Sequence, residues 1–179
     1  MDIIIQAFFI LLLLVFFIFF VIQFFNICFR GFAPFISTRS RVIQKIINEL
    51  KIKEDATVYE LGCGRAGFLR ALRKKYPQAK LTGIEYSFLP YLLGQIQNSF
   101  TGSKLKIIKK NFLKVDLSQA DVIYCYLNEK TMKSLEGKFK NECKGDTIII
   151  SYLFSLPNTK SEKELAVRNE KDKVYFYRI

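Results

Sequence analysis

The chain has a formal net charge of +12 and 179 residues, a length that suffices for one domain and little else. It contains no histidine, and this excludes histidine bases, histidine metal ligands and a Ser-His-Asp triad. Its four cysteines, Cys28, Cys63, Cys125 and Cys143, lack metal-ligand spacing, so we expect reduced thiols and no metal site.

The N-terminal segment is apolar, with no charge in residues 3–29 and no polar side chain in residues 7–22. A helix needs about 20 apolar residues to cross a bilayer, and a buried core helix of this size would normally keep a polar face. No basic segment precedes it and no small-residue cleavage site follows, which disfavours a cleaved signal peptide. We predict a transmembrane anchor over residues 1–29, a linker over 30–40 and a domain over 41–179.

The charge distribution predicts the orientation of this anchor. The first basic residue is Arg30, and Arg39, Arg41 and Lys45 follow closely, so the positive-inside rule places the domain in the cytoplasm of a single-pass protein. Beyond the anchor, 28 basic residues stand against 15 acids, a net charge of +13. Such a domain is attracted to anionic lipid, so the bilayer is the expected partner. Nucleic-acid binding is the competing interpretation, which we consider weaker because the anchor already places lipid beside the domain.

The remaining pattern is that of alternating helices and strands. Residues 42–50 carry a helical apolar stripe that packs on the domain or lies on the membrane, with Thr38 and Ser40 as candidate caps. Near-continuous apolar runs, typical of buried parallel strands, alternate with helical segments. The tail, 164–168 and 174–179, predicts a closing antiparallel hairpin, and the connection after Pro157 is too short for a full helix. The strands are expected at 57–61, 81–85, 105–108, 121–127 and 146–153, and the helices at 67–76, 90–100 and 131–143.

The most informative motif is VYELGCGRAG at 58–67, where an apolar strand runs into a glycine-rich turn and a helix. A second strand then ends on Glu85. Glycines let the backbone approach a ligand, and an acid at the end of the second strand accepts hydrogen bonds from ribose hydroxyls. The motif therefore predicts a Rossmann-like α/β sheet that binds an adenosine-bearing cofactor.

Two features favour S-adenosylmethionine as this cofactor. Glu60 precedes Gly62 by two residues, where a carboxylate would repel a pyrophosphate but attract the ammonium and sulfonium groups. The frame GIEYS at 83–87 is the usual sequence after the second strand of class I methyltransferases. Against this, Gly62, Gly64 and Gly67 also spell the dinucleotide pattern G-x-G-x-x-G, with Ala66 at the third glycine position of a methyltransferase turn. A dinucleotide enzyme and an inactive relic remain alternatives.

Several stretches resemble small membrane-anchored class I methyltransferases. These are prokaryotic relatives of the mitochondrial protein-lysine methyltransferases that modify the ATP synthase c subunit and the adenine nucleotide carrier. The resemblance covers most of residues 34–157 and implies a mostly parallel methyltransferase sheet with a C-terminal antiparallel hairpin. The matching stretches are PFISTRSRVIQKII (34–47), VYELGCG (58–64), LTGIEYS (81–87) and ADVIYCYLNEKTMKSLEGKFKNE (120–142).

The resemblance also implies site residues. It places Thr38 and Glu60 near the methionine end of the cofactor, Glu85 on the ribose and Asn111 near the adenine. Tyr126 and Asn128, at the end of the fourth strand, face the transferred methyl group and are the candidate catalytic residues. Arg65 and Ala66 depart from the usual Asp-Gly of the turn. The full set of candidate cofactor-binding residues is Thr38, Glu60, Gly62, Cys63, Gly64, Gly67, Glu85, Tyr86, Asn111 and Phe112.

The expected reaction transfers a methyl group to a lysine of a protein near the membrane. A lysine must first lose its proton, since its reference pKa is about 10.4, and without histidine the candidate acceptors are Tyr126, Asn128, Glu129 and backbone carbonyls. The NPPY-type signature of adenine and glutamine methyltransferases is absent from 124–129. One alternative is a lipid or quinone methyltransferase with an apolar groove beside Phe32–Phe35. Another is a non-catalytic, membrane-tethered protein.

Overall fold

The chain divides into two units, Met1–Pro34 and Phe35–Ile179. The computed structural model describes residues 2–30, 37–167 and 172–179. The first unit is helix α1 (Asp2–Arg30), and its stretch Ile3–Phe25 is long and apolar enough to cross a membrane. Most of the predicted linker lies outside the described residues, and so does the apolar groove expected beside Phe32–Phe35.

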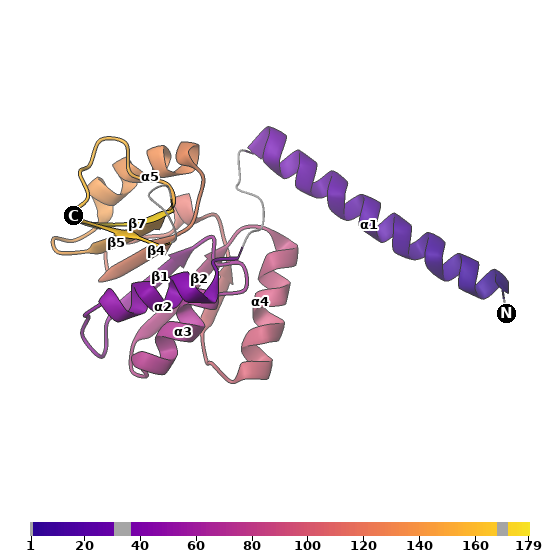
Figure 1. Cartoon of the computed structure of the whole chain (residues 1–179), viewed down its shortest axis with the longest axis horizontal. Coiled ribbons are helices and arrows are strands. Elements are labelled where there is room, and N and C mark those ends of the chain that lie inside the picture. The colour runs from indigo at the N-terminus through magenta and orange to yellow at the C-terminus, as the bar shows by residue number, and fades with distance from the viewer. Residues whose placement is uncertain (1, 31–36, 168–171) are drawn as a thin grey trace. The chain divides into compact units, whose positions relative to one another are not determined.

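The second unit is built on a seven-stranded sheet of order β3-β2-β1-β4-β5-β7-β6. The first five strands are parallel, while β7 pairs antiparallel with both β5 and β6. The predicted parallel sheet with a closing hairpin is therefore confirmed (Figure 1). The strands are β1 (Thr57–Leu61), β2 (Lys80–Glu85), β3 (Lys106–Lys109), β4 (Val122–Cys125), β5 (Ile148–Tyr152), β6 (Lys163–Ala166) and β7 (Lys173–Arg178).

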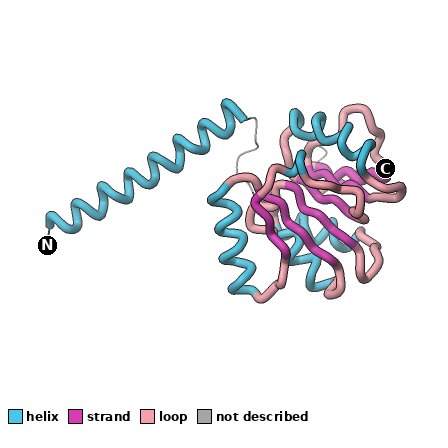
Figure 2. Tube along the Cα trace, turned by 180° about the vertical axis from the view of Figure 1, so that it is seen from behind, coloured by secondary structure: helices cyan, strands magenta, loops and turns pink. Residues whose placement is uncertain are grey.

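Helices cover both faces of the sheet because neighbouring strand residues point to opposite sides. On β4, the Tyr124 ring stacks on Phe68 of α3 at 4.3 Å between centroids. The next residue, Cys125, places its sulfur 3.7 Å from that of Met132 in α5 on the other face. Figure 2, seen from behind, shows the strands in front of the helices on the α3 side of the sheet. The helices of this unit are α2 (Ser40–Glu49), α3 (Gly67–Lys75), α4 (Phe88–Thr101), α5 (Glu129–Glu142) and the short 3-10 helix η1 (Phe112–Lys114).

Helix α2 packs on the domain, as one of the two predictions for it stated. Its apolar stripe is buried, and it ends against α3, where Lys75 Nζ donates to the carbonyls of Ile47 (2.7 Å) and Leu50 (3.2 Å). These bonds satisfy carbonyls that the end of a helix leaves unpaired. The expected caps are wrong: the N-cap is Arg39, which makes no side-chain capping bond, and Ser40 is already helical.

The connection from β5 to β6 contains no helix among the described residues 153–162, as the short sequence predicted. The buried carboxylate of Glu136 in α5 holds this segment instead. It accepts hydrogen bonds from the Asn158 backbone N–H (3.0 Å), the Thr159 hydroxyl (2.5 Å) and Lys140 Nζ (3.2 Å). Hydrogen bonds to this one carboxylate thus fix the segment, in place of the packing that a crossover helix would supply.

Candidate functional site

The turn after β1 has the backbone of a G-x-G-x-G turn. Its left-handed residues are Gly62 (φ +70°), Gly64 (φ +49°) and Ala66 (φ +54°). Gly67 instead opens α3, and a Cβ there would meet Ile43 at an ordinary 3.6 Å. Only glycine adopts left-handed angles without steric cost. The third position of this turn that favours glycine is therefore occupied by Ala66. The G-x-G-x-x-G spacing therefore does not describe this turn.

The turn is held closely by its neighbours. The Gly62 and Cys63 N–H groups both donate to the Ile84 carbonyl, at 2.8 and 3.1 Å. A Cβ on Gly62 would lie 2.9 Å from a Leu127 methyl group, and a Cβ on Gly94 of α4 would lie 2.6 Å from the Gly64 carbonyl oxygen. The backbone of the turn is thus fixed from two sides. Sequence reasoning missed Gly94, for which the only signal was a glycine inside a helical pattern.

Cys63 contributes packing as well as backbone to this turn. Its sulfur occupies the space beside Gly83, where an added Cβ would approach it to 2.7 Å. Burial raises the pKa of the thiol far above its usual value, so this cysteine stays protonated.

Glu85 ends β2 and faces the turn. Its Oε2 accepts a hydrogen bond from the Gly64 N–H at 3.0 Å, and its Oε1 accepts one from the Ser87 N–H at 2.8 Å. Burial raises the pKa of this carboxyl, and the backbone hydrogen bonds oppose that shift. A carboxylate oxygen has a second lone pair, so both oxygens can still accept from ribose hydroxyls. Tyr86, the next residue, exposes 37% of its surface beside this carboxylate.

Glu60 lies one strand away and is buried on β1, with 6% of its surface exposed. Its Oε2 accepts a hydrogen bond from the Leu69 N–H at 3.3 Å, in the first turn of α3. Burial raises the pKa of this carboxyl to about 8, against the opposing charge of Arg70. A cation bound beside Glu60 would restore the ionised carboxylate. The site therefore fits an ammonium group better than a phosphate.

Tyr124 links Glu60 to the segment before α2. It is the strand neighbour of Glu60 in the register of β1 and β4, and its hydroxyl lies 2.7 Å from Thr38 Oγ1. Thr38 thus lies beside the strand neighbour of Glu60, and its contact with the methionine end of the cofactor stays a prediction. Sequence reasoning missed Tyr124, although its two-residue spacing from Tyr126 on an apolar strand was a usable signal.

The departure at Arg65 is accommodated at the surface. Its side chain is exposed, and its backbone carbonyl accepts a hydrogen bond from the Arg70 guanidinium. Ala66, by contrast, is fully buried in its left-handed conformation.

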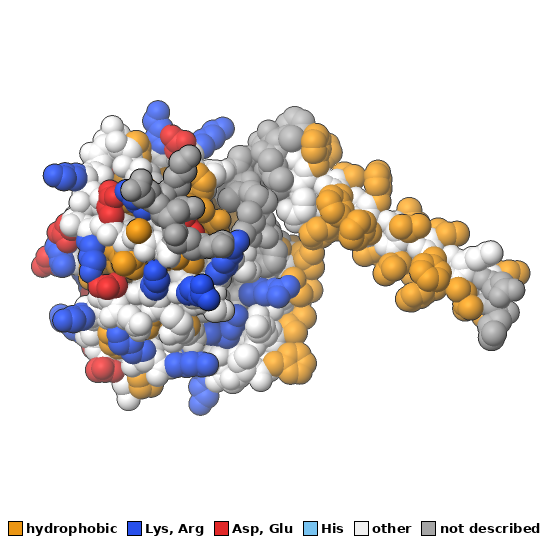
Figure 3. Space-filling model, viewed as in Figure 1, with side chains coloured by type: hydrophobic (Ala, Val, Ile, Leu, Met, Phe, Trp, Pro, Cys, Tyr) orange, Lys and Arg blue, Asp and Glu red, His pale blue; other side chains and the backbone are white. Residues whose placement is uncertain are grey.

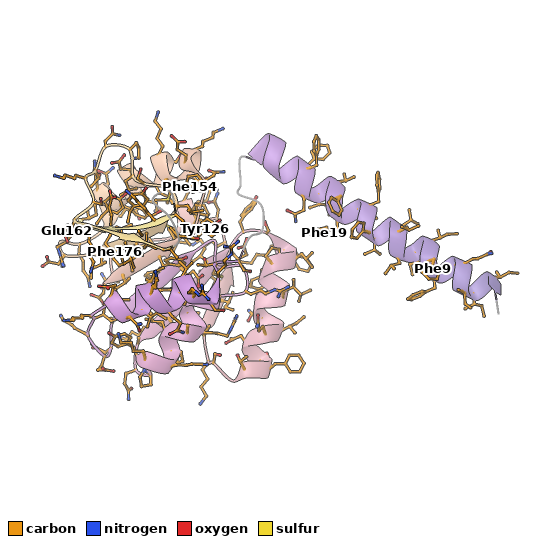
Figure 4. The ribbon with its side chains drawn as sticks, in the orientation of Figure 1. Phe9, Phe19, Tyr126, Phe154, Glu162 and Phe176 are labelled. Atoms are coloured by element: carbon orange, nitrogen blue, oxygen red, sulfur yellow. The ribbon has the colours of Figure 1, made fainter. Side chains whose placement is uncertain are left out.

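A second group of polar side chains gathers where β4 and β5 end. The Tyr126 and Tyr152 rings lie 4.7 Å apart between centroids. Burial, together with a hydrogen bond to Asp172 and its charge, raises the pKa of Tyr152 to about 12. The Arg39 guanidinium acts in the opposite direction on both tyrosines. Figure 4 labels Tyr126 and also Phe154, which follows β5 at the same end of the sheet.

The two candidate asparagines both act as caps. Asn128 accepts a hydrogen bond from the Thr131 N–H at 2.9 Å and begins α5. Asn111 accepts one from the Leu113 N–H at 2.9 Å and begins η1, whose Phe112 is buried. Their amide oxygens therefore have a structural role. The functional roles of Asn111, Phe112 and Asn128 stay predictions. Among the described residues, no group of three or more Cys, Asp or Glu is arranged to hold a metal.

Comparison with known proteins agrees with this geometry. A protein-lysine N-methyltransferase of Saccharolobus islandicus is 27% identical over 150 residues, which span 82% of this chain and 93% of that protein. An RNA methyltransferase from Salinibacter ruber, solved with S-adenosyl-L-homocysteine, superposes with a TM-score of 0.74 at 18% identity, covering 80% of this chain and 94% of that one. PKMT2 from Rickettsia typhi, solved with AdoHcy, gives a TM-score of 0.52 at 19% identity, covering 67% and 26%.

The sheet order and the turn thus define a class I methyltransferase fold. Residues 60–163, more than half of the chain, match the ANTKMT methyltransferase domain, and the chain belongs to that family. It is therefore a methyltransferase, and its cofactor is S-adenosylmethionine. The alternatives of a dinucleotide enzyme and of a non-catalytic protein are set aside.

Proposed function

We propose that this protein is a membrane-anchored methyltransferase that methylates a lysine of a protein at the membrane surface. The name of the Saccharolobus relative supports a lysine acceptor, and the long apolar helix α1 supports the anchor. The basic residues that follow α1 favour a cytoplasmic domain. Tethering would confine the site to acceptors close to the bilayer.

The observation that carries the proposal is the pair of buried carboxylates, Glu60 and Glu85, on either side of a left-handed turn. Glu85 would hold the ribose hydroxyls, while Glu60 would pair with the ammonium group of the methionine part. Gly62 and Gly64 leave the backbone of the turn without side chains. When bound, S-adenosylmethionine supplies a methyl group that its sulfonium has already activated.

The tyrosines at the ends of β4 and β5 would receive the acceptor lysine. Aromatic faces and the Asp172 carboxylate attract an ammonium group, and a site that excludes water favours the neutral amine needed for attack. The carboxylate of Asp172 would accept the leaving proton, while the hydroxyl oxygen of Tyr126 would accept a hydrogen bond from the amine. Asn128 would act beside them through the amide group that also caps α5.

The test is to incubate the full-length protein in detergent with methyl-labelled S-adenosylmethionine and host membranes. We expect label in one or a few proteins, recovered as methyllysine after hydrolysis, and no label with Glu85→Ala. Label found only in the lipid extract would overturn the protein acceptor in favour of a lipid or quinone. Label on another amino acid would overturn the lysine acceptor.

A further inference from the structure

Helix α4 differs from an ordinary surface helix, because the amide side chains of Gln95 and Asn98 face the sheet beside its buried Pro90 and Gly94. Gln95 Nε2 donates to the Ile107 carbonyl at 3.2 Å. Asn98 donates to the Leu105 carbonyl at 2.9 Å and accepts from the Leu105 N–H at 3.1 Å. These two amides thus bond the backbone of β3 and of Leu105, the residue that precedes it.

The apolar side of α4 faces outward. Phe88, Leu92, Ile96 and Phe100 recur every fourth residue, so they form one stripe along the helix, and Leu89 lies beside it. Phe88 exposes 61% of its surface and Phe100 exposes 88%. The helix carries no charged residue. Figure 3 shows these orange side chains along the outer edge of the domain. A contiguous apolar surface of this kind marks an interaction site.

Lysines border this stripe. Residues 86–115 contain five lysines and no acid, and all five are exposed around the edge strand β3. Lys109 Nζ lies 4.9 Å from the centroid of the Phe88 ring. The five are Lys104, Lys106, Lys109, Lys110 and Lys114.

We propose that the α4 stripe and these lysines dock on a lipid surface that carries anionic headgroups. The apolar side chains would enter the headgroup–acyl boundary while the lysines contact phosphates and carboxylates, as in interfacial amphipathic helices. A second copy of the chain is a poor occupant, because it would bring two acid-free lysine clusters together. Nucleic acid would meet the lysines but leave the phenyl and aliphatic stripe in water.

Docking would orient the site as well as attach it. Gly94, on the inner side of α4, is in contact range of the Gly64 carbonyl in the cofactor turn. Only the thickness of this helix, about 10 Å, would therefore separate the turn from the lipid. The surface deepens the proposed function and rests on its membrane location, because it selects acceptor lysines near the headgroups.

The chain has no tryptophan, so a single one reports its own surroundings. Full-length protein carrying Phe100→Trp would be reconstituted into vesicles of phosphatidylcholine and phosphatidylserine with brominated acyl chains. The matched control is Lys133→Trp, at an exposed position of α5 on the other face of the sheet. We expect strong quenching and a blue shift for Phe100→Trp, and neither for Lys133→Trp.

Lysine variants test the charge. Replacing Lys106, Lys109 and Lys110 by Gln should weaken the quenching at least twofold, while the same change at three exposed lysines elsewhere should not.

Co-flotation with the vesicles but no quenching would overturn the docking surface and leave the anchor intact. Quenching that disappears when RNA is added, or a blue shift that needs only higher protein concentration, would also overturn it. Failure to co-float would overturn both the anchor and the docking surface, whereas the labelling experiment tests the acceptor separately. The three control lysines are Lys130, Lys133 and Lys160.

Discussion

Two halves of the proposed site differ in how they are built. The cofactor half (Glu60, the turn 62–66 and Glu85) comes from adjacent parallel strands, and its carboxylates are buried and bound by backbone N–H groups. The proposed acceptor half (Tyr126, Tyr152 and Asp172) comes from the residue after β4, the last residue of β5 and the residue before the antiparallel β7, and its side chains interact with one another. The cofactor half is fixed by the backbone, whereas the acceptor half depends on tertiary packing. Substitutions in the two halves should therefore affect different measurements.

The largest effect is expected for Glu85→Ala, which removes both proposed acceptors for the ribose hydroxyls and leaves the buried Gly64 N–H without its partner. Charged hydrogen bonds contribute about 1.5–3 kcal/mol each, so cofactor affinity should fall about a hundredfold or more in a calorimetric titration. Glu129→Ala, at an exposed acid in the first turn of α5, is the control and should leave the affinity unchanged. Equal affinity for both variants would remove Glu85 from the cofactor half.

The pH dependence of the cofactor half should follow Glu60. Burial raises its folded-state pKa from 4.5 to about 8, so between these values the folded chain holds a proton that the unfolded chain has lost. The free energy of unfolding should therefore decrease as pH rises through this window.

A cationic ligand favours the ionised carboxylate, so cofactor affinity should increase with pH below about 8, by at most tenfold per pH unit. Titrations of the wild type and of Glu60→Gln across this range check the assignment. Glu60→Gln should give a flat profile. A variant that keeps the wild-type slope would show that another group titrates.

A pair of helix glycines separates loop clamping from helix propensity. Gly94→Ala would place a methyl group 2.6 Å from the Gly64 carbonyl oxygen. The free energy of unfolding should therefore decrease by about 1–3 kcal/mol, and cofactor affinity should decrease about tenfold. Gly137→Ala in α5 meets no atom within 4 Å and should instead stabilise the fold by about 1 kcal/mol. If both changes stabilise the fold, α4 does not support the turn.

The smallest effect is expected in the acceptor half. Tyr126→Phe keeps the ring against Tyr152 but removes one hydroxyl, so kcat should fall about tenfold while the cofactor Kd stays constant. Tyr59→Phe, a partly buried tyrosine on β1, is the control for losing a hydroxyl elsewhere. A change in the cofactor Kd for Tyr126→Phe would contradict the separation of the two halves.

Local patterns in the sequence were sufficient for most of the sheet and for the positions of the turn and of Glu85. Apolar runs predict buried strands because both faces of a parallel sheet are covered, and glycines predict the turn because left-handed angles exclude most side chains. The end of β2 on Glu85 follows from the same logic, since the carboxyl ends of parallel strands share one edge. These features depend on neighbours along the chain or on the adjacent strand.

Tertiary packing decided what sequence spacing does not encode. Thr38 bonds to Tyr124 across 86 residues instead of capping α2, and Asp172 reaches Tyr152 only because β7 runs antiparallel to β5. The sequence predicted a helix at 90–100, but the outward position of the apolar face of α4 became apparent only in the structure. Gln95 and Asn98 turn toward the sheet to bond the backbone of Ile107 and Leu105, so the apolar stripe lies on the opposite, exposed side of the helix.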